Sequence, residues 1–423
     1  MSWQKVAPRE ERSPGKGVPG CFMPCEGAEA ARRLAPEWTG RVQTLYIDPP
    51  YMSGKTYYFT QRVGAAGWQG DPSARLTRPA YTDRWPGREA YLAFLRETLT
   101  AALPLLREDG SIFVHVDWRT SHHVRLLLDD LLGEHRFRNE IIWAYNSGGR
   151  SRDSFSRKHD TIFYYRAGKR AAFYPDAVGE RRGRERRNNL RRGIENGRVY
   201  FAINVGRKEY RYYEDDILTP GDVWTDIPVL QQRDPLRVGY ETQKPPALLE
   251  RILLCSTRPG DAVLDLFSGS GTTAEVAAQL GRIPLAADPA RDALHLFRRR
   301  VRLAGGHYKL PDPPAWQGEE TAGDWRLTRA SDIARITFLR CEAEDIPSPA
   351  NPMPLLPDTL WAADAWSAGY LSEGVYTASV FFARTRERPA LPRQAEVAVP
   401  PGARPAVSFT DAAGRTFYRV WAE

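Results

Sequence analysis

The hydrophobic positions of residues 41–145 alternate between short apolar runs and stretches with helical spacing. Val42–Asp48 (VQTLYID) is mostly apolar and ends at two prolines, which is typical of a buried strand. Further along, apolar residues recur every three or four positions, which predicts amphipathic helices. The other elements predicted up to residue 145 are helices over Gly27–Leu34, Tyr91–Glu108 and His123–Leu132, a turn at Asp109-Gly110, and strands over Ser111–Asp117 and Asn139–Tyr145.

The same alternation returns in residues 241–305. Here the pattern predicts a helix over 246–257, a strand over Ala262–Phe267, a helix over 272–280 and a strand over Ile283–Asp288. Strands that alternate with helices form parallel sheets covered by helices on both faces. The sequence therefore predicts an α/β fold built from two segments that a long insertion separates.

The rest of the chain has a different texture. Residues 150–240 lack the alternation, and the proline-rich stretches Pro311–Trp316 and Pro347–Pro357 are typical of linkers. Beyond them, strand-like segments end in a predicted hairpin across Ala412–Gly414. We divide the chain into an N-terminal arm (1–24), a first α/β half (25–149), a central region (150–240), a second α/β half (241–305) and a β-rich C-terminal domain (306–423).

A chain of 423 residues can form two or three domains with well-buried cores. Its 42% hydrophobic and 26% charged residues are the balance of a folded soluble protein, and no apolar run approaches the roughly 18–20 residues of a membrane span. Four cysteines are too few for a disulfide-built fold, and no zinc-like spacing follows Cys21 and Cys25. We expect a cytoplasmic protein with no metal site and no membrane partner.

The formal net charge of +8 comes from the middle of the chain. Residues 150–213 hold 18 Lys and Arg against 7 Asp and Glu, so the remainder carries a small negative charge. A solvated surface would explain a single basic helix. A whole segment with this imbalance instead favours a polyanionic partner, because neutralising phosphates releases their counterions.

Asp48-Pro49-Pro50-Tyr51 follows the first predicted strand at its carboxyl end, where open α/β sheets bind their ligands. The two prolines have no amide donor, so this turn presents carbonyl and carboxylate oxygens that accept hydrogen bonds. Such a turn suits a ligand group that carries N–H donors, and Tyr51 adds a flat face for stacking. The alternative is a proline-rich turn in which the aspartate caps a helix.

A glycine-rich turn over residues 265–273 (DLFSGSGTT) follows a predicted strand and opens a predicted helix. Nucleotide-binding turns have this setting, because glycines allow the backbone to approach a ligand and the helix start presents free N–H groups. Asp288 ends the next strand, where an acidic residue commonly binds ribose hydroxyls. The turn lacks the Gly-Lys-Ser/Thr ending of a P-loop, which argues against an NTPase.

Together these motifs resemble the S-adenosylmethionine-dependent DNA amino-methyltransferases of the β arrangement, in which the catalytic DPPY half precedes the cofactor half. The resemblance implies a Rossmann-like class I methyltransferase fold with a mostly parallel seven-stranded sheet and circularly permuted motifs. Residues 25–149 and 241–305 would be the catalytic and cofactor halves, and residues 150–240 the target-recognition region. The resemblance runs from about Gly27 to Gly305 and includes the blocks LYIDPPY, YTDRW, GSIFVHVDWRTSH, FRNEIIWAYNSGG, KHDTIFYY, TQKPPALLERIL and VLDLFSGSGTT.

The resemblance also implies the roles of individual residues. The Asp48 carboxylate and the Pro49 carbonyl would accept the two N–H bonds of an exocyclic amine, which then takes the methyl group by direct in-line transfer. The target base would be flipped out of the duplex and stacked on Tyr51, and Pro50 completes the catalytic turn. For Lys244 a surface salt bridge is the alternative. The cofactor would contact Asp48, Gln243, Lys244, Asp265, Phe267, Gly269, Gly271, Thr272, Thr273 and Asp288.

An arginine-rich run in the central region is the candidate DNA contact. Most arginine contacts to DNA go to phosphates, and the run could equally be an arm that becomes ordered on DNA. The arginines concerned are Arg181, Arg182, Arg184, Arg186, Arg187, Arg191 and Arg192. The chain departs from the family at Pro24–Gly27, where relatives have Gly-Asp-Asn, at Met52–Gly54, where they have Asn-Thr-Gly, and at Leu266, which replaces a proline.

The predicted function is methylation of adenine N6 in specific sequences of double-stranded DNA, for restriction–modification, phage defence or epigenetic marking. The DPP form favours adenine, since cytosine-N4 enzymes more often carry serine before the prolines. The alternatives are a cytosine-N4 methyltransferase, an RNA or protein-glutamine methyltransferase, and an inactive DNA-binding subunit of a methylation or defence complex. Homodimerisation is expected and a restriction or phage-defence partner stays open, in the nucleoid-associated cytoplasm of a prokaryote or encoded by a phage.

Overall fold

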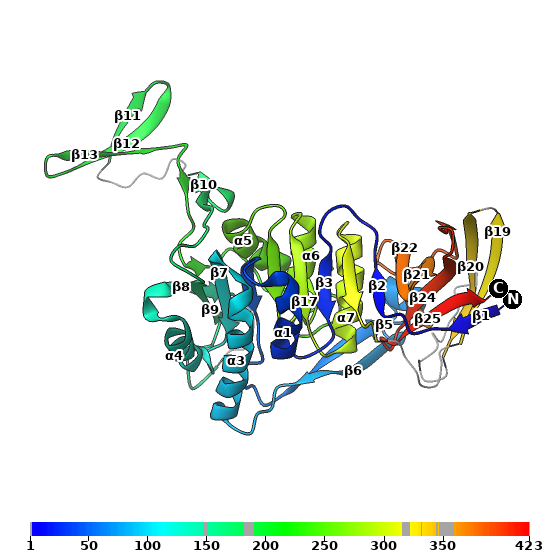
Figure 1. The fold of residues 1–423 in the computed structure, drawn as a ribbon. Coiled ribbons are helices and arrows are strands. Elements are labelled where there is room, and N and C mark those ends of the chain that lie inside the picture. The colour runs from blue at the N-terminus through cyan, green and yellow to red at the C-terminus, as the bar shows by residue number, and fades with distance from the viewer. Residues whose placement is uncertain are drawn as a thin grey trace.

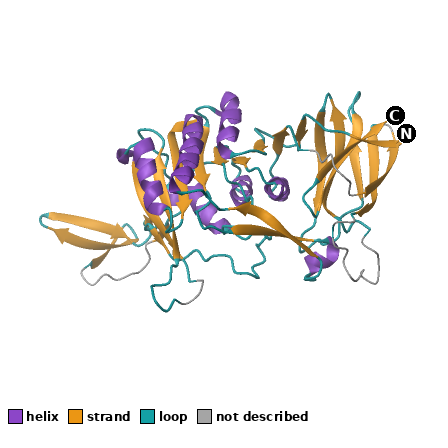
Figure 2. Cartoon of the chain, turned by 90° about the horizontal axis from the view of Figure 1, so that it is seen from below, coloured by secondary structure: helices purple, strands orange, loops and turns teal. Residues whose placement is uncertain are grey.

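The computed structural model of the protein describes residues 2–146, 151–181, 190–314, 322–330, 332–343, 346 and 359–422. They form an α/β body, a β-rich part that holds both chain ends, and a small sheet that projects from the other side of the body (Figure 1). Figure 2 shows the same order of parts from below, with most helices gathered in the body. In the described part of the chain, no helix has the length and apolar character needed to span a bilayer.

The body contains the middle of a sheet that joins fifteen strands among the described residues. Five of its central strands run parallel to one another, and the strand after them is antiparallel to both of its neighbours. The predicted α/β fold is confirmed, with a mixed sheet. In spatial order these strands are β3 (Gly20–Met23), β17 (Ile283–Ala287), β16 (Ala262–Asp265), β4 (Val42–Ile47), β7 (Leu106–Val116), β9 (His159–Arg166) and β8 (Phe137–Ala144).

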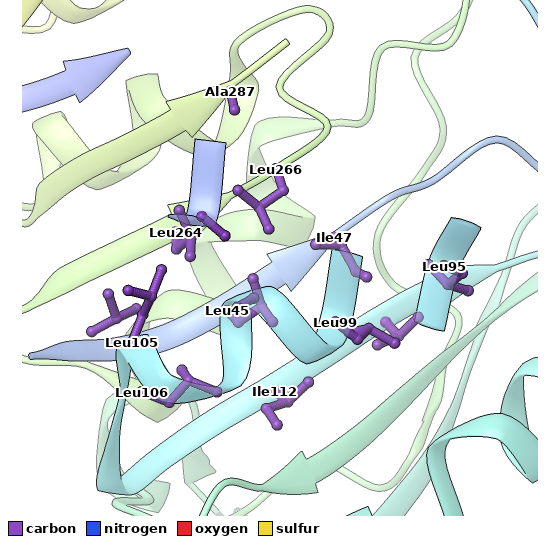
Figure 3. Close-up of a cluster of buried hydrophobic side chains, with 14 of the residues drawn as sticks. Leu45, Ile47, Leu95, Leu99, Leu105, Leu106, Ile112, Leu264, Leu266 and Ala287 are labelled. Atoms are coloured by element: carbon purple, nitrogen blue, oxygen red, sulfur yellow. The ribbon is translucent and has the colours of Figure 1, made fainter. Parts of the chain in front are cut away.

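Helices cover both faces of this sheet, which explains why its central strands are apolar at successive positions. They are α1 (Gly27–Trp38), α3 (Arg88–Ala102), α4 (Ser121–Leu132), α5 (Pro246–Ser256), α6 (Thr272–Gln279) and α7 (Arg291–Leu303). All six residues of β4 are buried. Leu45 and Ile47 join the core beneath α1, α3 and α4, part of which Figure 3 shows, whereas Tyr46 points into the core beneath α5 and α6.

The largest difference from the predicted elements of the body lies at Asp109-Gly110. The sequence predicts a turn there, but the structure has an irregularity inside the long strand β7. The pairing of β7 with β4 passes directly from Leu106 to Ser111, so the residues between them bulge out. Arg107 secures the bulge through ion pairs with Asp109 and Asp261. The turn-type residues are thus accommodated without ending the strand.

The N-terminal segment, expected to be an arm, is part of the β structure. β1 (Ser2–Lys5) pairs with the last strand, and β2 (Glu10–Arg12) lies between β18 and β22, so the large sheet runs unbroken into the C-terminal region. Its strands there are β18 (Tyr308–Pro311), β21 (Ala363–Ser372), β22 (Val375–Ala383), β24 (Arg404–Asp411) and β25 (Thr416–Ala422), the last two forming the predicted hairpin. A second sheet of β19 (Ala322–Ala330), β20 (Ile333–Glu342) and β23 (Gln394–Ala398) shares a buried core with it.

A long hairpin bridges the body and the β-rich part. It consists of β5 (Thr56–Arg62) and β6 (Arg75–Thr82), with the short helix α2 (Gly64–Gln69) at its far end. The β-rich part holds that end, because Val63 is buried in its core and the Gln61 amide donates to Asp364 at 2.8 Å. Arg78 on β6 forms an ion pair with Asp292 of α7. The hairpin is therefore fixed to both parts.

The projecting sheet comes from the central region. Its strands are β11 (Arg191–Glu195), β12 (Arg198–Val205) and β13 (Lys208–Tyr213), and β10 (Glu180–Arg181) pairs with β14 (Ile217–Leu218) at its base. The chain leading to it is attached where Ala172 donates to the Asp109 carbonyl, at the amino-terminal edge of the parallel strands. It returns through β15 (Val223–Trp224), parallel to β8. The sheet therefore leaves the body at the edge opposite the carboxyl ends of the strands (Figure 1).

A buried ionic cluster joins β2, α7 and the last strand. Glu11 accepts hydrogen bonds from Arg298 at 2.5 Å and from Tyr308 at 2.6 Å, and Arg298 also donates to Tyr418 at 2.6 Å. Glu11 and Arg298 are only 2% and 3% exposed. Although burial disfavours its charge, Glu11 and the neighbouring tyrosines raise the pKa of Arg298 above its ordinary value. The two parts of the molecule are thus joined by a charge pair that needs both partners.

We expect Glu11→Gln to lower the free energy of unfolding by about 3–5 kcal/mol, because Arg298 then stays buried without a counter-charge. The midpoint of urea unfolding measures this loss. The double variant Glu11→Leu/Arg298→Met should lose less, since it buries no unpaired charge. The control is Glu10→Gln on the same strand, whose partner Arg12 is exposed. Equal effects of Glu10→Gln and Glu11→Gln would contradict the assignment.

Candidate active site

A cavity of about 660 Å³ lies at the carboxyl ends of β4, β16 and β17. It brings together nearly all of the site residues proposed from the catalytic and cofactor motifs. Those that line it are Asp48, Pro49, Pro50, Tyr51, Gln243, Lys244, Asp265, Phe267, Gly269, Thr272, Thr273 and Asp288. Gly271 does not line the cavity, because it is the N-cap of α6 behind the turn.

Asp48 accepts hydrogen bonds at both of its carboxylate oxygens. Lys244, 196 residues away in the chain, donates to Oδ2 at 2.5 Å, and the hydroxyl of Tyr51 donates to Oδ1. The side chains of Asp48 and Lys244 are 18% and 12% exposed, so this salt bridge lies inside the cavity and not on the open surface. The turn therefore works as an acceptor for an N–H donor, here the ammonium group of Lys244.

The turn after Tyr51 is organised by Asp83, which the sequence analysis did not assign. The buried Asp83 carboxylate accepts the backbone N–H groups of Tyr51, Met52 and Ser53 at 2.8–3.0 Å and the indole N–H of Trp85 at 3.0 Å. Met52 has a φ of +57°, a left-handed conformation that is strained for this side chain. The four hydrogen bonds to one carboxylate hold the catalytic turn in that conformation.

The glycine turn is secured by two buried carboxylates. Gly269 and Gly271 have φ values of +45° and +72°, which favour glycine. Asp288 accepts the N–H groups of Gly269 and Ala290, each at 2.9 Å, and burial raises its pKa to about 6. Burial likewise raises the pKa of Asp265 to about 7. Both carboxyl groups therefore change protonation near neutral pH.

Gln243 supports the wall opposite the glycine turn. Its side-chain oxygen accepts the Val238 N–H and its amide donates to the Leu236 carbonyl, both at 2.9 Å. The loop that it secures belongs to the central region, whose residues 229–232 also line the cavity. Gln243 thus shapes the cavity through the backbone, a role that its position in the TQKP block does not reveal.

A second polar chain behind Asp48 was also missed. Asp160 lines the cavity and is bonded to His115 Nε2 and to the hydroxyl of Tyr145, each at 3.1 Å. On its other side His115 Nδ1 meets the Tyr46 hydroxyl at 3.0 Å. Burial alone would raise the pKa of Asp160, but His115 and Lys244 outweigh it and hold this pKa below its usual value. Sequence spacing gives no sign of this chain, because its members come from four different segments.

The residues at the glycine turn fit a nucleoside ligand. The Ser268 hydroxyl is buried and lacks a hydrogen-bond partner among the described residues. Buried hydroxyls are rarely left without a partner, so a polar ligand group is expected beside it. Phe267 supplies an aromatic surface, and Asp288 supplies carboxylate oxygens that can accept ribose hydroxyls.

The arginines proposed to contact DNA do not lie at this cavity. Arg191 and Arg192 are exposed on β11 of the projecting sheet, and Arg191 forms an ion pair with Glu209 at 2.7 Å. Arg181 lies in β10 at the base of that sheet. Arg182, Arg184, Arg186 and Arg187 lie outside the described residues. The parts of the central region that line the cavity are instead residues 229–232, Arg237 and Tyr240.

An α/β sheet with an acceptor turn and a glycine turn at one cavity defines the protein as a methyltransferase that uses S-adenosylmethionine. Residues 42–291 match the N6/N4 DNA methylase family, and the chain belongs to this family. It is therefore a DNA amino-methyltransferase, as the sequence resemblance predicts.

Named relatives share a quarter or less of their residues with this chain. Type II methyltransferase M.EcaI of Enterobacter cloacae is 25% identical over 68% of this chain and 70% of its own. DNA adenine methyltransferase YhdJ of Escherichia coli K12 is 23% identical over 69% of this chain and 86% of its own. The DNA modification methylase TTHA0409 of Thermus thermophilus, solved with S-adenosyl-L-methionine, is 17% identical with a TM-score of 0.42, covering 71% of this chain and 100% of its own.

We expect Asp83→Asn to slow methyl transfer about 10- to 100-fold, because a displaced catalytic turn loses the alignment on which in-line transfer depends. Cofactor affinity should change little, since Asp83 holds the DPPY turn and not the glycine turn. Single-turnover transfer and calorimetric cofactor binding measure the two effects. The control is Asp130→Asn, an exposed partner of Arg96. Transfer by Asp83→Asn at the rate of the control would refute the role of Asp83.

Proposed function

We propose that the protein methylates the N6 amino group of adenine in specific sequences of duplex DNA. The observation that carries the proposal is the Asp48 turn, which already accepts an N–H donor, facing the glycine turn across one cavity. An exocyclic amine presents such donors. The relative named as an adenine methyltransferase and the DPP form of the motif favour adenine over cytosine N4. The type II relatives favour a place in restriction–modification.

We place S-adenosylmethionine against Phe267, Ser268, Gly269, Thr272 and Asp288. When bound, it supplies a methyl group on an electrophilic sulfonium. The cavity carries more carboxylates than cations, which favours a positively charged ligand. We also propose that the seven strands from β3 to β8 are the methyltransferase sheet of the family, with the catalytic half first in the chain.

Asp48 acts as a hydrogen-bond acceptor in this proposal. Its Oδ2 exchanges the Lys244 ammonium for an N–H of the target amine, and the Pro49 carbonyl accepts the second N–H. Tyr51 keeps Oδ1 occupied and so holds the carboxylate in one orientation. These two acceptors favour a more tetrahedral nitrogen whose lone pair points at the methyl donor, so positioning provides most of the catalysis. The amine becomes acidic only after it is methylated, so Asp48 need not be a strong base.

The target adenine must leave the duplex to reach Asp48. Three tyrosines of the cavity wall lie in stacked pairs, Tyr57 with Tyr81 at 5.1 Å and Tyr81 with Tyr240 at 6.4 Å. Together with Tyr51 they offer aromatic surface for a flipped base. Residues 229–241 border the same opening, and we assign the nearest sequence-reading contacts to them rather than to the arginine run.

The decisive experiment is incubation of the protein with methyl-labelled S-adenosylmethionine and duplex DNA, followed by nucleoside analysis. Label in N6-methyladenine supports the proposal, and label in N4-methylcytosine would replace adenine by cytosine. DNA binding without label would point to an inactive subunit. Sequencing of the treated DNA then gives the methylated sequence.

Asp48→Ala should lower methyl transfer by at least about 100-fold, because one of the two acceptors for the amine is lost. Cofactor binding should be largely kept, since the glycine turn does not depend on Asp48. Labelled transfer and equilibrium dialysis of the cofactor measure the two properties. Turnover at the wild-type rate would refute the acceptor role.

Cofactor affinity should fall as the pH drops through about 6, because the pKa of Asp288 is raised to about 6 and its protonated form loses an acceptor for the ribose. Calorimetric titrations between pH 5 and pH 8 measure the profile. Asp288→Asn should bind weakly throughout and lose this part of the pH dependence. Asp265, whose pKa is about 7, titrates nearby and remains in the variant as an internal reference. A wild-type profile that is flat across this range would contradict the assignment.

A further inference from the structure

A second cavity, of about 410 Å³, lies at the far end of the β5–β6 hairpin. It shares no residue with the catalytic cavity, and it has a strongly basic lining without a carboxylate. The residues that line it are Arg62, Gly67, Trp68, Gln69, Gly70, Arg75 and Arg386. Three guanidinium groups from three segments therefore converge on one hollow.

These arginines repel one another in the folded chain. Arg62 and Arg75 are directly opposite in the pairing of β5 with β6, a position where like charges are destabilising. Arg386 comes from the loop after β22 and completes the group. Within the described ranges, no carboxylate forms an ion pair with any of the three. Burial, reinforced by Arg386 and Arg75, lowers the pKa of Arg62.

The carboxylates nearest in sequence are already engaged. Asp71, between the two strands, accepts hydrogen bonds from the backbone N–H and the hydroxyl of Ser73. Glu387 is hydrogen-bonded to Thr385. The positive charge of the cavity is thus left for a ligand to neutralise.

Trp68 forms a buried wall of this cavity. Only 8% of it is exposed, and Arg62 and Arg299 lie 4.8 Å and 4.2 Å from the centre of its ring. Its indole N–H is buried and has no hydrogen-bond partner among the described residues. Arg62 is therefore held by cation–π packing, and the exposed side chains of Arg75 and Arg386 remain available beside it.

We propose that this cavity binds a phosphate of the DNA backbone beside the methylated site. The inference rests on the proposed function and adds a contact that the β-rich part shares. Guanidinium groups suit phosphate because their N–H donors match its oxygens in bidentate pairs. A cluster of three unpaired arginines is what a single doubly contacted phosphate, or two successive ones, would neutralise.

The hairpin itself argues for DNA rather than a free anion. Tyr57 lines the catalytic cavity and Arg62 lines the second one, and both lie on β5. Five strand residues span roughly 17 Å, which is about five base pairs of duplex DNA. Figure 2 shows the hairpin running from the body toward the β-rich part. A duplex that places its flipped base at Asp48 would therefore carry its flank along this ribbon.

The test compares the wild-type protein with Arg75→Ala/Arg386→Ala, whose two side chains are exposed and not needed for packing. The control is Arg404→Ala, an exposed arginine of the β-rich part outside both cavities. Binding to a random-sequence 30-base-pair duplex is measured by fluorescence anisotropy over a range of salt concentrations. We expect the slope of log K against log salt to shrink by about 1 to 2 in the double variant, as for one or two lost phosphate contacts. A slope equal to that of the control overturns the proposal.

A second arm separates DNA from a free anion. Inorganic phosphate and pyrophosphate are titrated into both proteins by calorimetry, and weaker anion binding by the variant with an unchanged DNA slope also overturns the proposal. On duplexes that carry the methylated sequence, removal of the flank should raise the KM of the wild-type protein but not that of the variant, with kcat unchanged in both. Failure of the proposed function shows separately, as absence of labelled methyl transfer by the wild-type protein.

Discussion

The parallel pairing of β4 with β16 is the constraint on which the site depends. Leu45 lies opposite Leu264 in this pairing, and both strands end at the same edge of the sheet, so the DPPY turn and the glycine turn face one cavity. Burial fixes the register, because a slip of one residue would exchange the faces of Leu45 and Tyr46 between two different cores. The distance between acceptor turn and cofactor turn is thus set by apolar packing far from the chemistry.

Electrostatics in the cavity follows from this convergence. Four aspartates, Asp48, Asp160, Asp265 and Asp288, line one enclosed space in which Lys244 is a close counter-charge. Burial is the main reason that the pKa values of two of them are raised, and mutual repulsion adds to it. Such a cavity favours a cationic ligand, since a positive charge relieves both effects. The same surplus of acceptors serves an amine, so one environment suits the methyl donor and the methyl acceptor.

Sequence patterns predicted the elements whose signal is local. The β4 strand and the glycine turn are recognisable because buried parallel strands are apolar throughout and a ligand-binding turn needs glycine. Helix α7 was not predicted, because three of its buried positions, Arg298 to Arg300, are charged and are neutralised only by partners elsewhere in the fold. Asp83 was missed for a related reason: its function consists of hydrogen bonds to a turn some thirty residues earlier. Pairings of this kind leave no periodic trace.

The charge excess of the central region illustrates the limit of counting. On the projecting sheet, arginines are paired within the sheet, Arg191 with Glu209, Arg198 with Asp215 and Arg211 with Glu195. A guanidinium that already has a carboxylate gains less from a phosphate, because the new contact must compete with the old one. The arginines of the second cavity are fewer and come from regions with no charge excess, yet they have no such partner. Unpaired arginines held at a fixed spacing from the catalytic cavity therefore indicate the path of DNA better than the density of arginine in the sequence.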